Sequence, residues 1–107
     1  MTFKIGGLIW RIENVPEYSD LLLRSDGSRT VGVCDRNSQT ISVSNLLQGA
    51  FLRKVLCHEV CHAAMFSHGV DMSIDQEELF CDLMATYGDE IIGITDDIFR
   101  VLKARVA

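Results

Sequence analysis

The stretch that decides the fold is Leu56-Cys57-His58-Glu59-Val60-Cys61-His62-Ala63. His58 and His62 are four positions apart, so on a helix they lie one turn above each other and can bind one metal ion. Glu59 lies between them, where it can take a proton from a metal-activated water. The spacing therefore predicts a metal-binding helix with Glu59 as its catalytic residue.

The motif lies in the middle of a segment with helical periodicity. Ser44 and Asn45 are of the residue types that cap a helix N-terminus, and Gly69 is of the type that ends one. Between them apolar residues recur at helical spacing, which predicts a helix of roughly 20 residues, from about 45 to 67. Because this helix is apolar on several faces, we expect it to be central.

Before this helix the chain shows short runs typical of β-strands, at 8–13, 30–34 and 40–43. The last two runs are joined by the polar segment 35–39, whose residues tolerate tight turns, so we expect a hairpin. Segment 16–29 fits either a helical turn or a further strand.

After Gly69 the pattern predicts two more helices, from about 74 to 87 and from about 89 to 106, separated at Gly88. Ser73 and Gln76 have the spacing of a capping box at the first of them. The fold class that results is α+β: a small antiparallel or mixed sheet of about three strands, packed on a central metal helix with two further helices. A chain of 107 residues fits a single domain, 1–107.

A third metal ligand is required, because catalytic zinc sites use three protein ligands and keep one position open. Glu78 follows His62 by sixteen residues and is followed at four by Asp82. If the two helices pack antiparallel, Glu78 reaches the ion, and Asp82 is placed to accept a hydrogen bond from one of the histidines. Glu77 is the competing ligand, although the residue four positions on is Cys81, which offers no carboxylate.

The expected cofactor is one Zn²⁺ ion, although two imidazoles and a carboxylate also suit manganese or iron. A structural Cys/His zinc site is the other metal hypothesis, since Cys57 and Cys61 each precede a histidine. It fares worse, because neighbours on a helix are about 100° apart and cannot easily converge on one ion. We expect the cysteines to be free thiols that pack as small apolar groups.

Peptide hydrolysis also needs a donor for the oxyanion that develops in the transition state. His68 and Tyr87 are the residues of suitable type near the motif, in sequence terms. His68 is also explained as an exposed loop residue, and Tyr87 as an anchor of its helix.

Charge and hydropathy exclude several classes of partner. The net charge of -5 and the pI near 5.0 disfavour binding to nucleic acid, which depends on clustered Lys and Arg. Apolar runs are far shorter than the ~20 residues that cross a bilayer, and no secretory signal is recognisable. We therefore expect a cytoplasmic protein with a protein or peptide substrate, without nucleic-acid or membrane partners. The sequence does not predict the oligomeric state.

Three segments, 32–43, 56–63 and 77–82, resemble the small gluzincin-type peptidases of the ImmA/IrrE group of bacteria, phages and mobile elements. The resemblance covers roughly residues 30 to 90. It departs from the commoner pattern at Val60 and Cys61, and the helix-turn-helix domain that some relatives carry is not seen.

The resemblance implies a hairpin or small sheet on the metal helix, zinc held by His58, His62 and Glu78, and Glu59 as the base. It also implies a protein substrate, in the family a repressor or other regulator. Our leading hypothesis is therefore a zinc-dependent peptidase. The alternative is an inactive or weakly active metal-binding module for protein–protein interaction, in which Phe3, Trp10 and the run 5–9 form an edge strand that pairs with an extended peptide.

Overall fold

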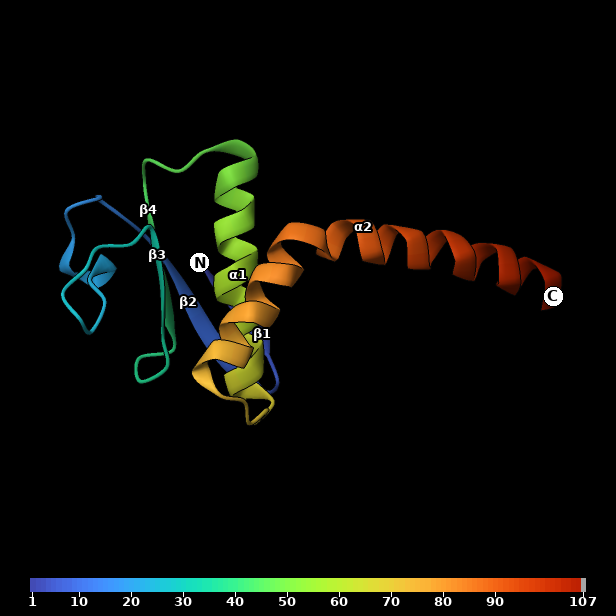
Figure 1. Cartoon of the computed structure of the whole chain (residues 1–107), viewed down its shortest axis with the longest axis horizontal. Coiled ribbons are helices and arrows are strands. Elements are labelled where there is room, and N and C mark those ends of the chain that lie inside the picture. The colour runs from blue at the N-terminus through green and yellow to red at the C-terminus, as the bar shows by residue number, and fades with distance from the viewer. Residues whose placement is uncertain (107) are drawn as a thin grey trace.

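The computed structural model describes residues 1–106, which form a four-stranded mixed sheet, two α-helices and one short 3₁₀ helix (Figure 1). In chain order the elements are β1 (Thr2–Ile5), β2 (Leu8–Val15), η1 (Asp20–Leu22), β3 (Gly32–Asp35), β4 (Thr40–Ser44), α1 (Gly49–Ser67) and α2 (Ile74–Val106). The predicted α+β class is confirmed, whereas the expected three strands are four. Within the undecided segment 16–29, the structure forms the helical turn η1.

The strands are ordered β1-β2-β4-β3, with β2 and β4 parallel and the two outer pairs antiparallel. The predicted hairpin is confirmed as β3 and β4, with Gln39 at a positive φ of 50° in its turn. The strand that we did not predict is β1. It is four residues long, and Gly6 and Gly7, both at positive φ, turn it directly back onto β2.

The core lies between the sheet and α1. Trp10, Ile41 and Ala63 are fully buried there, and the indole Nε1 of Trp10 donates to Ser67 Oγ at 2.8 Å. The expectation that Trp10 belongs to an edge strand open to a peptide is wrong, because β2 is an inner strand and this side chain points into the core. A buried Trp with its N–H satisfied is a packing residue.

Helix α1 begins at Gly49, four or five residues later than the expected caps Ser44 and Asn45. Ser44 instead ends strand β4, and its Oγ accepts from the backbone N–H of Leu46 at 3.2 Å in the connecting turn. The end of the helix is as predicted, with Gly69 at a φ of 66° just beyond it.

Helix α2 is continuous, so the expected break at Gly88 is wrong. A single glycine costs a helix only about 1 kcal/mol, and here Gly88 is buried, with Met84 close beside it. The capping box is confirmed, since Ser73 and Gln76 exchange two backbone-to-side-chain bonds of 3.2 Å. Figure 1 shows α2 changing direction about midway and running out beyond α1, which gives the molecule its longest extent of 55 Å.

Within residues 1–106, no helix combines the length and the apolar character needed to cross a membrane.

Candidate metal centre

The side chains of His58, His62 and Glu78 meet where α1 and α2 pack together. One ligand-type atom from each lies within 4.8 Å of the others. The Nε2 atoms of the two imidazoles are 3.1 Å apart. The Glu78 carboxylate lies 2.8 Å from His62 Nε2 and 3.3 Å from His58 Nε2. The predicted trio is therefore brought together from two helices, in the geometry that the antiparallel packing requires.

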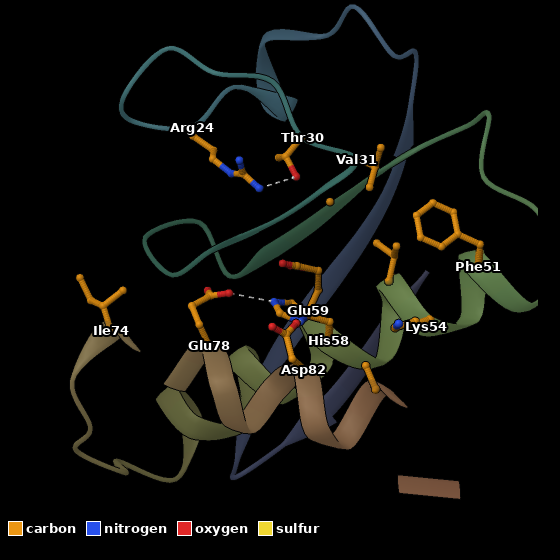
Figure 2. A pocket seen from close by; sticks show the side chains of 13 residues that line it. Arg24, Thr30, Val31, Phe51, Lys54, His58, Glu59, Ile74, Glu78 and Asp82 are labelled. Atoms are coloured by element: carbon orange, nitrogen blue, oxygen red, sulfur yellow. Dashed lines mark hydrogen bonds and ion pairs between the residues drawn. The ribbon is translucent and has the colours of Figure 1, made fainter. Parts of the chain in front are cut away.

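The other ring nitrogen of each histidine faces a carboxylate. His58 Nδ1 lies 2.8 Å from Asp82 Oδ1, and His62 Nδ1 lies 2.8 Å from Glu77 Oε2. When each Nδ1 carries the proton, its N–H group donates to the facing carboxylate. Both Nε2 atoms then keep a free lone pair on the side of Glu78. Figure 2 shows the contact between His58 on α1 and Glu78 on α2, with Asp82 beside them on α2.

Glu77 thus lies at the outer nitrogen of His62, not with the trio. It is buried and also forms an ion pair with Arg36, from the turn between β3 and β4. Although burial acts to raise it, hydrogen bonds from Arg36 and His62 hold the pKa of the Glu77 carboxyl below its ordinary value. Sequence reasoning missed this link, because Arg36 is 41 positions away and only the fold brings it here.

Glu59 is buried beside the trio, and its Oε2 has no hydrogen-bond partner. The pKa of this carboxyl is raised to about 7, chiefly by burial, with Glu78 adding to the rise and His58 opposing it. Gly32 in β3 makes room for it: a Cβ there would lie 2.7 Å from Val55 Cγ1 and 3.3 Å from Glu59 Cγ. A close backbone approach thus places Glu59 under the sheet edge.

These residues fit a divalent metal ion. Two imidazoles with carboxylate-held Nδ1 atoms and one further carboxylate form a donor set that zinc accepts. The orphaned oxygen of Glu59 supports the same reading, since a buried carboxylate without a partner is costly unless a ligand supplies one. No cysteine belongs to this group among the described residues, so the Cys/His alternative gains no support.

A cleft of about 550 Å³ opens beside the trio and contains His58, Glu59, Glu78 and Asp82 in its lining. Its other walls are mostly basic or apolar, as labelled in Figure 2, with Arg24, Val31, Phe51, Lys54 and Ile74 beside the polar Thr30. The sequence did not single these residues out, because they come from three separate segments. Strand β3 borders this cleft at the edge of the sheet.

His68 and Tyr87 do not line the cleft. His68 caps the C-terminal end of α1 and is exposed, and Tyr87 is 52% exposed on α2. The structure therefore gives neither residue a place from which to act as the oxyanion donor.

The cysteines are free thiols, and three of them lie at the packing of α1 against α2. Cys57 Sγ lies 3.8 Å from the Met84 carbonyl oxygen, and Cys81 is fully buried. Burial raises the pKa of the Cys61 thiol to about 11, with Cys57 adding to the rise, so this thiol stays protonated near neutral pH. These cysteines pack as small apolar groups, as expected.

An α+β fold with a His-Glu-x-x-His helix and a facing carboxylate on the next helix defines a zincin-like domain of the metallopeptidase type. Residues 17–90 match the SprT-like family, and the chain belongs to that family. No curated protein and no solved structure gives a significant match to the chain. The match confirms the zincin-like class, whereas it does not confirm the resemblance to the ImmA/IrrE group.

Proposed function

We propose that the chain is a zinc-dependent peptidase that hydrolyses a peptide bond in a protein substrate. The observation that supports this most is the pairing of the His58, His62 and Glu78 cluster with the buried, unpartnered carboxylate oxygen of Glu59. A structural metal site has no need for a free carboxylate beside the ligands, whereas hydrolysis requires a base there. Membership in the SprT-like family supports the same class of reaction.

In this proposal the histidine Nε2 atoms and the Glu78 carboxylate hold the ion, which when bound supplies Lewis-acid activation of water and of the scissile carbonyl. Asp82 and Glu77 accept from the two Nδ1 atoms and so keep both imidazoles in the tautomer that binds metal. These contacts fix the ring orientations before substrate arrives.

The Glu59 carboxylate accepts the proton from water at Oε2 and later gives it to the leaving amine. Burial raises the pKa of this carboxyl, which strengthens its hold on the proton that it takes from water. Gly32 of β3 lies against the Glu59 side chain, so the fold sets the position of this carboxylate.

The substrate would lie along β3, whose outer edge borders the cleft. An extended peptide can add to such an edge through main-chain hydrogen bonds, while its side chains enter the cleft. Arg24 and Lys54 are cations in the wall, which favours substrates with acidic or polar side chains near the cleaved bond.

A repressor or other regulator as substrate rests on the ImmA/IrrE resemblance alone. We propose the cytoplasm as the compartment, because reducing conditions keep thiols free, and the net charge of -5 argues against a nucleic-acid partner.

Glu59→Gln tests the proposal, because it removes the base while keeping the size of the side chain. We expect zinc binding to persist and cleavage of a peptide library, followed by mass spectrometry, to slow by at least ~10²-fold. Cleavage at the wild-type rate by Glu59→Gln would contradict the peptidase. A zinc-loaded wild type that cleaves nothing, with a biological effect that survives Glu59→Gln, would instead favour the metal-binding module without catalysis.

A further inference from the structure

The C-terminal half of α2 extends past the end of its partner helix. The whole of α2 has 33 residues and spans ~50 Å at ~1.5 Å per residue. Asp89, where its C-terminal half begins, forms an ion pair with Arg53, close to the first turn of α1. Every residue from 89 to 105 is exposed. The distal half of α2, residues 89–106, lies almost wholly beyond the range 17–90 that matches the SprT-like family. Neither the metal centre nor the cleft contains any residue of this half.

Large apolar side chains nevertheless cover one side of this distal half. At 100° per residue they fall on one half of the helix circumference, and every charged residue except Arg105 falls on the other. We call this set the distal apolar face: Ile91, Ile92, Ile94, Ile98, Phe99, Val101 and Leu102. Their exposed fractions run from 53% for Ile94 to 61% for Phe99. Exposed apolar patches of this kind mark interaction sites.

The face continues the surface with which α2 packs on α1. Cys81, Met84 and Gly88 lie on that packed surface at spacings of three and four. The same alternation continues past Gly88 to Ile92, Thr95, Phe99 and Leu102. A neighbouring stripe, Ile91, Ile94, Ile98 and Val101, repeats the spacing that helices use to pack on other helices. This spacing suits packing against another helix, beyond the point where α1 ends.

The charges on this half indicate which helix. Its acidic residues come first, Asp89, Glu90, Asp96 and Asp97, and its basic residues come last, Arg100, Lys103 and Arg105. Of these residues, Asp96 and Lys103 border the apolar face, and two copies packed antiparallel bring Asp96 of each toward Lys103 of the other. The same patch then serves both copies, as a two-fold axis requires. Parallel packing would bring like charges together.

A lipid surface fits less well. Amphipathic helices that lie on membranes carry a polar face rich in Lys and Arg, and here four acidic residues stand against three basic ones in a chain of net charge -5. We therefore propose that the distal half of α2 is a self-association surface, which packs antiparallel on the same segment of a second copy. This inference does not depend on the proposed peptidase activity.

Sedimentation equilibrium over a concentration series tests it on the full chain. We expect the mass to rise from the 12.0 kDa of one chain to at least twice that value. Ile98→Asp places a charge in the middle of the contact in both copies and should weaken association by at least ~100-fold. Ala104→Asp introduces the same side chain on the charged side of the helix and should leave association within about threefold of wild type.

The orientation is tested by charge exchange. Asp96→Lys should weaken association about threefold, and adding Lys103→Asp should restore it, because opposite charges again face each other in the antiparallel pair. Helix content by circular dichroism shows that each variant is folded.

A wild type that stays monomeric at every concentration would overturn the proposal. So would association that Ile98→Asp leaves unchanged, or a monomer that binds phosphatidylcholine or phosphatidylserine vesicles.

Discussion

The two halves of α2 share one helix and one periodicity but differ in what they are used for. In the first half, 74–88, buried Glu77 and Cys81 face α1, and Glu78 and Asp82 reach its histidines. In the second half, 89–106, the apolar residues have no such neighbour in the described chain. Periodicity therefore predicts a helix and its apolar and polar faces. A metal centre also needs a second element that contributes ligands, as α1 does with its histidines.

The largest difference between the two halves of α2 is expected in the free energy of unfolding, when one negative charge is introduced into each half. Cys81→Asp places a carboxylate where burial already raises the pKa of the native thiol, so it should lower the free energy of unfolding by about 3 kcal/mol or more. Ala104→Asp on the distal half should change it by less than about 1 kcal/mol. Urea unfolding followed by circular dichroism measures both, and equal losses would show that the halves are packed alike.

An intermediate effect is expected from the carboxylates behind the histidines. Glu77→Gln keeps the size of the side chain but loses the charge that holds His62 Nδ1, and Asp82→Asn does the same at His58. Each should weaken zinc binding by 10–100-fold, as outer partners of metal-bound histidines do.

Glu90→Gln in the distal half is the matched control for Glu77→Gln and should leave zinc affinity unchanged. Competition with a chromophoric chelator gives the affinities. If Glu77→Gln binds zinc as tightly as wild type, Glu77 does not position His62.

The smallest effect concerns two glycines of the same helix. At Gly93 a Cβ would meet nothing within 4 Å, whereas at Gly88 it would lie 3.3 Å from Met84 Cε. Gly93→Ala should therefore stabilise the helix by roughly 0.5–1 kcal/mol, and Gly88→Ala by less, because Met84 must move. Helix content and thermal unfolding of the two variants make the comparison, which fails if Gly88→Ala gains more than Gly93→Ala.

Much of the first half of α2 could be predicted from the sequence, because its signals are local. The capping box at Ser73 and Gln76 and the four-residue spacing of Glu78 and Asp82 need only helical geometry. The motif on α1 and the β3–β4 hairpin are local in the same sense. All of these could be placed before any tertiary contact was known.

The rest depends on contacts between distant segments. Arg36 reaches Glu77 only when the β3–β4 hairpin packs near α2. Glu77, which the sequence offered as a competing metal ligand, contacts His62 Nδ1 instead. Strand β1 is too short to be recognised without β2 beside it. Gly88 predicted the end of a helix when the sequence was considered alone. In the fold it is buried within a continuous helix, where the lack of a side chain leaves room for Met84.

Metal content tests most directly whether side chains from two helices hold one metal ion. For protein purified without chelator, mass spectrometry of the metal should find one zinc ion per wild-type chain. His58→Ala and Glu78→Ala, shown to be folded by circular dichroism, should each lose at least ~100-fold in zinc affinity. A wild type without metal, or a Glu78→Ala variant that binds zinc as tightly as wild type, would contradict a metal centre shared by the two helices.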